Sequence, residues 1–390
     1  MKFKFAPVLG LAVASTTLFS FAPQSARAAS GTVIIVAEGL SPQVLDLGKG
    51  YLRKADEDLE LSTSFDELQD KAKPATIGTD ALAQLGGILQ TAHDNGYATG
   101  LVTTGDVTKI APLFYKLNGD VAADLTAKAA PYEFLAGGGA MNLSGASEKI
   151  AANGGTFVGS ADALDGELKG RILATEVPGE LNYSIDRDPA QESGLGELAT
   201  TALDTLAAGD KPFVLVIHDS LIKRALDTKD TPALFEQFRE LNTLVGDAVA
   251  RRDDDPNLKV AALMTGASNT PMFSTTSPEE RNNAYFVASN LQKSFAGGGT
   301  ELKGKTVEDI TAFADADAGD YRGWNVSQSD KEKIAAGTLD PESALRASYE
   351  PTLKLNYDAT PTSAYAFTLG FEAPNGLVAA LQAAVATPAK

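Results

Sequence analysis

The chain has 390 residues, a formal net charge of −18 and no cysteine. This excess of negative charge argues against binding to nucleic acid or to an anionic membrane through bulk electrostatics. The lack of cysteine excludes disulfides and thiolate metal sites. Because 44% of the residues are hydrophobic, a chain of this length can bury a large core without disulfides.

The first 28 residues have the pattern of a cleaved export signal. Lys2 and Lys4 precede a mostly apolar run over residues 5–21, and Ala26-Arg27-Ala28 has the small-x-small pattern of a signal-peptidase site. Cleavage there removes three positive charges and takes the formal net charge from −18 to −21. No later stretch is long and apolar enough to span a bilayer. We therefore expect a periplasmic or secreted protein whose mature domain covers residues 29–390.

Strand and helix patterns alternate along the mature chain. Residues 32–37 form a β-branched run typical of a strand covered on both faces. Residues 80–95 carry apolar side chains at helical spacing, and Gly96 follows where a helix would end. Ser193 is the expected N-cap of another helix, over residues 195–207. The other predicted elements are strands over 98–103, 213–217, 258–264 and 365–369, and helices over 231–251 and 376–385.

This alternation predicts an α/β fold, a three-layer sandwich with a mostly parallel central sheet and helices on both faces. Residues 283–348 break the alternation, since they are polar and contain Gly297-Gly298-Gly299. We interpret them as an insertion beside the sheet and not as a separate domain. Ligand sites in open α/β sheets lie at the carboxyl ends of the strands. The strands that begin near Thr32, Phe213 and Leu258 should therefore end at one common cleft.

Four segments, in order, resemble the alkaline phosphatase family. Residues 36–41 follow the first strand, where the family has Gly-Asp-Gly-Met-Gly. Residues 88–104 match its next helix, turn and strand, and residues 134–139 resemble its Leu-Gly-Gly-Gly turn. Residues 183–189 and the helices and strands that follow them continue the match. The resemblance covers most of the mature chain and implies the alkaline phosphatase-like sandwich and a possible homodimer.

The resemblance also implies a phosphomonoesterase with two zinc ions, but the chain departs from the family at the metal positions. Glu38 stands where the family has an aspartate, and His218 where it has a metal-binding glutamate. Lys223 replaces a zinc-binding aspartate, and Asp227 replaces a zinc-binding histidine. The Asp-His pair after the Leu258 strand has no counterpart in this chain. The whole chain has 2 histidines, too few for the three histidine ligands of the family.

The serine nucleophile of the family also lacks a clear counterpart. Ser64 could occupy that place, with Phe65 where the family has a small residue. The competing interpretation is an ordinary N-cap serine, with Glu67 three residues later completing a capping box.

Each remaining motif also has a structural interpretation. His218 at a strand end is either a hydrogen-bonded core residue or a ligand, and Glu38 near Lys223 suggests an ion pair that fills a former metal site. Residues 137–139 favour a turn over a phosphate cradle, because no Lys-Ser/Thr follows them. Residues 253–255, three aspartates, suggest an exposed loop more than a calcium site.

Two functions therefore remain open. The first is an exported, catalytically inactive homologue with a binding or structural role, an unknown ligand or protein partner and no cofactor. The second is an active phosphomonoester hydrolase with a site rebuilt around Glu38, His218, Asp227 and Ser64, which would need zinc or magnesium. If the metals are lost, we expect Lys223 or Arg224 to form an ion pair with Glu38 or Asp227 inside the old cleft. The alternative is that this loop turns outward and leaves the four side chains separately solvated.

Overall fold

The computed structural model describes residues 30–55, 62–75, 77–78, 80–316, 325–359, 362–373 and 376–389. The predicted export signal, residues 1–28, lies outside the described residues. Across these ranges, we find no helix with both the length and the apolar character needed to cross a membrane.

Nine strands form one mixed, mostly parallel sheet in the order β2-β11-β8-β1-β7-β3-β4-β6-β5. β11 runs antiparallel to its two neighbours, and the remaining neighbours are parallel. This arrangement confirms the predicted sandwich. The strands are β1 (Gly31–Ala37), β2 (Lys73–Ala75), β3 (Ala98–Asp106), β4 (Phe134–Gly138), β5 (Thr156–Val158), β6 (Ile172–Thr175), β7 (Phe213–Asp219), β8 (Lys259–Met264) and β11 (Tyr365–Leu369).

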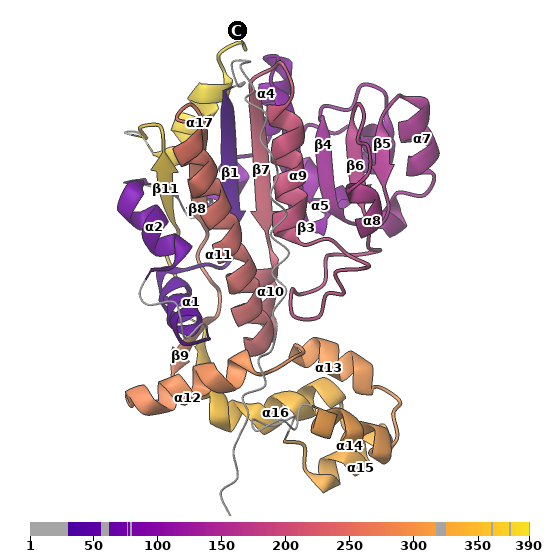
Figure 1. Cartoon of the computed structure of the whole chain (residues 1–390), viewed down its shortest axis with the longest axis vertical. Coiled ribbons are helices and arrows are strands. Elements are labelled where there is room, and N and C mark those ends of the chain that lie inside the picture. The colour runs from indigo at the N-terminus through magenta and orange to yellow at the C-terminus, as the bar shows by residue number, and fades with distance from the viewer. Residues whose placement is uncertain are drawn as a thin grey trace, which may run out of the picture.

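Helices cover both faces of this sheet (Figure 1). Successive residues of β1 point into different cores: Val33 and Ile35 pack with α9 and α11, whereas Ile34 and Val36 pack with α4, α5 and α17. The helices beside the sheet are α1 (Pro42–Ala55), α2 (Ser64–Lys71), α3 (Ala81–Gln84), α4 (Ile88–Asp94), α5 (Val107–Phe114), α6 (Val121–Thr126), η1 (Ala140–Asn142), α7 (Ala146–Ala152), α8 (Ala161–Leu164), α9 (Leu195–Ala207), α10 (Leu221–Thr228), α11 (Thr231–Asp254) and α17 (Leu377–Val385).

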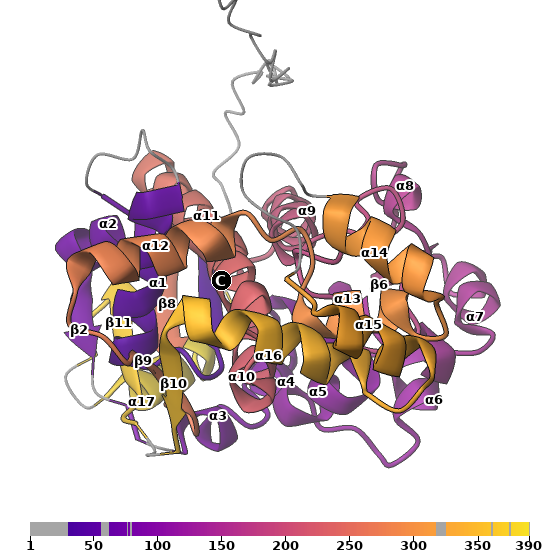
Figure 2. The same cartoon turned by 90° about the horizontal axis from the view of Figure 1, so that it is seen from below.

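The predicted polar insertion is largely helical. Over the residues of this segment that the structure describes, 278–316 and 325–353, there are five helices, which we call the cap: α12 (Pro278–Ser289), α13 (Phe295–Leu302), α14 (Val307–Ala316), α15 (Gln328–Ala335) and α16 (Pro341–Leu353). A two-stranded sheet of β9 (Thr270–Phe273) and β10 (Leu355–Asp358) joins both ends of the cap to the rest of the chain. Figures 1 and 2 show the cap lying across the end of the sheet at which β1 and β7 finish.

Three local predictions need correction. The helix expected over residues 80–95 is two helices, because Gly87 adopts a left-handed φ of 71° between α3 and α4. The N-cap of α9 is Gly194, and the Ser193 hydroxyl instead donates a hydrogen bond to Glu176, 2.9 Å away. The last helix positions of α11 include the first two of the three aspartates at 253–255, which are therefore not all in a loop.

Candidate functional site at the carboxyl end of the sheet

The carboxyl ends of three adjacent strands bring the first group of site residues together. β7 pairs with β1 and β3, and in these registers His218 lies opposite Val36 on one side and Thr103 on the other. Glu38 follows β1 directly, and its amide donates to the carbonyl of Asp219 over 2.8 Å. Glu38 and His218 therefore meet at one edge, as expected for parallel strands that end together.

Glu38, His218 and Thr103 form a continuous hydrogen-bonded chain. His218 Nε2 lies 2.7 Å from Glu38 Oε1, and His218 Nδ1 lies 2.9 Å from Thr103 Oγ1. Thr103 Oγ1 also accepts a hydrogen bond from the amide of Gly105 over 3.0 Å. If the Thr103 hydroxyl donates to Nδ1, then Nε2 carries the ring proton and donates it to Glu38. Both ring nitrogens of His218 then have a partner. His218 is fully buried, whereas the Glu38 side chain keeps 20% of its surface exposed.

The predicted ion pair exists, but only between Lys223 and Asp227. These residues lie one turn apart on α10 and form an ion pair at the surface, with 44% and 37% of their side chains exposed. Asp227 also accepts a hydrogen bond from Ser268, 2.8 Å away. Partial burial raises the pKa of Asp227, but the hydrogen bonds from Lys223 and Ser268 outweigh burial and hold the pKa below its ordinary value.

The suggested pair between Glu38 and Lys223 is wrong, because Glu38 has His218 as its partner. Lys223 approaches this edge through its backbone instead. A Cβ atom placed on Gly39, which has a φ of +82°, would lie 2.9 Å from the Lys223 Cα. Arg224 lies over the ring of Tyr183, 4.9 Å from its centroid, and 3.4 Å from a carboxylate oxygen of Glu180.

Asp219, the residue after His218, points to the opposite face of the sheet. Its Oδ1 accepts hydrogen bonds from the amide of Leu221 over 2.8 Å and from the hydroxyl of Thr104 over 3.3 Å. Its Oδ2 lies 3.5 Å from Nε2 of Gln237 on α11. Because Asp219 is buried, its pKa is raised to about 6.

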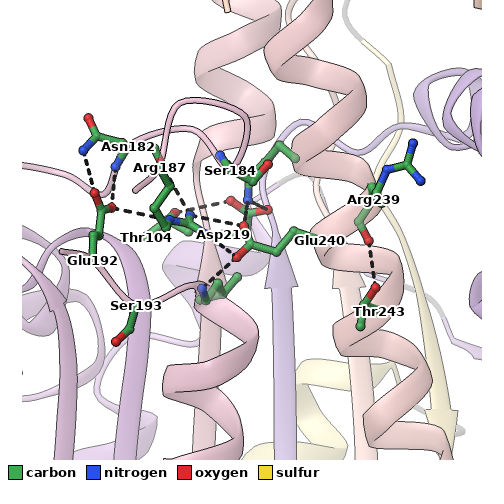
Figure 3. A network of polar contacts seen from close by, with 12 residues as sticks. Thr104, Asn182, Ser184, Arg187, Glu192, Ser193, Asp219, Arg239, Glu240 and Thr243 are labelled. Atoms are coloured by element: carbon green, nitrogen blue, oxygen red, sulfur yellow. Dashed lines mark hydrogen bonds and ion pairs between the residues drawn. The ribbon is translucent and has the colours of Figure 1, made fainter. Parts of the chain in front are cut away.

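A buried network around Arg187 continues from Gln237 (Figure 3). Gln237 donates to Glu240 over 2.8 Å, and Arg187 binds both oxygens of Glu240 through Nη1 and Nη2, at 2.6 and 3.3 Å. Arg187 Nε lies 3.6 Å from Glu192, which in turn accepts from the amide of Asn182 over 2.7 Å. The network fixes the loop over residues 182–192 against α9 and α11, beside the carboxyl end of β7.

Ser64 does not join either group of residues. It is the first residue of α2, and its hydroxyl accepts a hydrogen bond from Asn242 of α11 over 3.4 Å. Asn242 is five residues beyond Gln237, about 7.5 Å farther along the axis of α11, so Ser64 contacts α11 away from the network. The predicted capping box is real but displaced by one residue, because Thr63 is the N-cap and Asp66 is its partner.

The residues present do not fit a zinc centre. Both ring nitrogens of His218 already lie within hydrogen-bond distance of protein partners, so a metal would have to displace Glu38 or Thr103 to bind this imidazole. The ammonium group of Lys223 occupies an oxygen of Asp227. In the part of the chain that the structure describes, no three His, Cys, Asp or Glu side chains cluster in a way that could hold a metal ion.

The sequence alone pointed to Glu38, His218 and Asp227, and to Lys223 as a partner of Asp227, but not to the bonds between Glu38, His218 and Thr103. Thr103 ends the strand predicted over 98–103, whereas Asp219 lies two residues beyond the strand predicted over 213–217, and only the register of β1, β7 and β3 shows which side chains meet. Arg187 belongs to the segment that resembled the family, yet its pairing with Glu240 joins residues far apart in the chain.

Comparison with known proteins finds alkaline phosphatases, all at low sequence identity. No family model matches the chain. Alkaline phosphatase 4 of Bacillus subtilis (strain 168) is 23% identical over 210 residues, which are 50% of this chain and 45% of that protein. The matched part thus spans less than half of that relative.

Two solved structures are similar over most of the chain. The cold-active alkaline phosphatase of a psychrophilic Shewanella sp. superposes with a TM-score of 0.70 and 17% identity, covering 88% of this chain and 94% of that one. The Thermus thermophilus alkaline phosphatase superposes with a TM-score of 0.70 and 16% identity, covering 90% of this chain and 88% of that one. The protein therefore has the alkaline phosphatase-like α/β fold, carried by a sequence that has diverged far from these relatives.

Proposed function

We propose that this protein is an exported, catalytically inactive protein of alkaline phosphatase-like fold, with a binding or structural role. The observation that carries the proposal is the hydrogen-bonded chain from Glu38 through His218 to Thr103. Side chains that bond to one another in this way stabilise the end of the sheet and engage both ring nitrogens of His218. The leader pattern in residues 1–28 supports export.

The chemistry of the remaining groups supports inactivity. Two-metal hydrolysis depends on a clamp that stabilises the attacking and leaving oxygens, and the residues here supply no such clamp. A metal-free alternative would need a nucleophile within hydrogen-bond reach of a base. Ser64 is bonded to Asn242, and Thr103 is fully buried behind His218. Neither hydroxyl is placed to attack a substrate that Glu38 could contact.

The experiment is a phosphatase assay with matched variants. Purified protein is incubated with p-nitrophenyl phosphate after addition of zinc and magnesium, and again after chelation. We expect the same background rate in both conditions and in Ser64→Ala and His218→Gln. A saturable rate that chelation removes and that His218→Gln lowers at least tenfold would establish the active hydrolase instead. A rate unchanged by His218→Gln would point to a contaminating enzyme, which a second purification would test.

A further inference from the structure

Two carboxylates of the α/β part of the molecule bind the start of α13 in the cap, beside the apolar contacts that α12 makes through Tyr285. Asp230, the fully buried N-cap of α11, also accepts hydrogen bonds from the amides of Phe295 and Ala296, at 3.1 and 3.0 Å. Asp186 accepts from the amide of Ser294 over 2.9 Å and from its hydroxyl. Carboxylates are stabilised at a helix N-terminus, where amides lack helical partners. These bonds form the seat of the cap.

The seat is closely packed as well as hydrogen-bonded. Ser294 is the N-cap of α13 and accepts from the amide of Gly297 over 2.8 Å. A Cβ atom on Gly297 would lie 2.2 Å from Asp186 Oδ1. Side chains larger than hydrogen therefore cannot occupy position 297 while Asp186 stays bound to Ser294. This explains one of the three glycines that stood out in the sequence.

Asp186 is followed directly by Arg187, the centre of the buried network beneath the site. The amides of both residues donate to the carbonyl of Tyr183, at 2.9 and 3.0 Å, so one turn holds them rigidly together. Asp186 faces the cap, whereas Arg187 binds Glu240. The network then continues through Gln237 to Asp219 at the end of β7. Figure 3 shows Arg187, Glu240 and Asp219 in this network.

We propose that this turn is a conformational latch, in which Asp186 holds the cap closed and Arg187 transmits its position to the carboxyl end of β7. When Asp186 releases Ser294, the turn over residues 183–187 loses its outer anchor, and the bond between Arg187 and Glu240 loosens with it. Because coupling between two sites is reciprocal, weakening Arg187 loosens the cap. The inference does not depend on whether the protein is catalytic.

The test is hydrogen–deuterium exchange of the full chain, comparing Asp186→Ala with Asp340→Ala. Asp340 is the matched control, because it caps α16 through the amide and hydroxyl of Ser343 but contacts no residue of the sheet. We expect Asp186→Ala to speed exchange about tenfold at residues 294–298 and also in peptides covering 182–192 and 237–240. Asp340→Ala should affect only the first turn of α16.

The reverse test uses Arg187→Lys, since the Arg187 side chain binds Glu240, Asn182 and Glu192, which all lie outside the cap. This variant should speed exchange at residues 294–298 severalfold. If Asp186→Ala does not fold, Ser294→Ala replaces it and should give the same pattern with smaller changes. The latch is overturned if Asp186→Ala speeds exchange only at α13 and Arg187→Lys leaves exchange at α13 unchanged. That result would show that the seat and the network are independent.

Discussion

Replacing Arg187 by methionine tests whether the network beneath the site holds the fold together. The Arg187 side chain is 8% exposed, and its partners Glu240 and Glu192 are 14% and 2% exposed. Removing the guanidinium leaves two carboxylates out of water without a cation. Breaking a buried ion pair in this way costs about 3–5 kcal/mol. We therefore expect Arg187→Met to lower the free energy of unfolding by about that amount.

The matched control is Arg251→Met, because Arg251 pairs with Asp204 at a similar distance of 2.6 Å but at the surface, where 34% and 62% of the side chains are exposed. An exposed pair contributes about 0–1 kcal/mol. Both variants are measured by urea denaturation, with the free energy of unfolding taken from the midpoint and slope.

A double variant separates two costs: the loss of the Arg187–Glu240 attraction, and the burial of Glu240 without a cation. The double variant Arg187→Met and Glu240→Met removes one of the unpaired carboxylates, so it should recover part of the loss. Recovery should be incomplete, because Glu240 also accepts from the amide of Leu195 over 2.9 Å at the start of α9. If Arg187→Met and Arg251→Met lower the free energy of unfolding equally, within about 1 kcal/mol, then burial does not make the Arg187 pair more important than an exposed pair, and the reasoning fails.

Four further predictions follow from single positions, each checked by denaturation. Burial raises the pKa of Asp219 from 3.8 to about 6, so the contribution of this one carboxyl to stability is greatest below pH 4 and declines as the pH rises toward 6. Asp219→Asn should remove this decline, about 3 kcal/mol, and an unchanged slope of stability against pH would refute it. Lys223→Ala should cost under about 1 kcal/mol because its pair is exposed, and a loss of 3 kcal/mol would show a buried pair. His218→Phe should cost about 1–3 kcal/mol by leaving Thr103 without its partner, whereas His93→Phe, whose Nδ1 has no hydrogen bond, should cost much less. Gly39→Ala should cost at least about 1 kcal/mol, since its φ is +82° and the added Cβ would press on the backbone of α10; a stable variant would contradict the close approach.

The fold was largely predictable because its strands carry strong local patterns. The run over residues 32–37 is apolar on both faces, and both faces of β1 are covered by helices. The break between α3 and α4 was less visible, since Gly87 interrupts an otherwise helical spacing. The cap helices escaped prediction because the segment is rich in polar residues and glycine, although in the structure its helices bury apolar side chains such as Phe295 and Leu345 in the main core.

The candidate site was predictable only in outline. Glu38 and His218 both follow or end buried strands, so parallel pairing alone placed them together. The partner of Glu38 was not predictable, because Lys223 could bind either Glu38 or Asp227, which lies four residues away on the same helix. In the structure Lys223 pairs with Asp227 within α10, and Glu38 binds the imidazole of His218 instead. The partners of Arg187 lie in separate segments that only the folded chain brings together.

Titration of the purified protein with zinc tests the central claim most directly. The claim is that Glu38, His218 and Asp227 are bonded to protein partners and hold no metal. Chelator-treated protein is titrated with zinc by calorimetry, in parallel with the variants Glu38→Gln and His218→Gln. Our account predicts no stoichiometric binding in the micromolar range and no difference among the three proteins. Binding of one or two zinc ions per chain that either variant abolishes would contradict it.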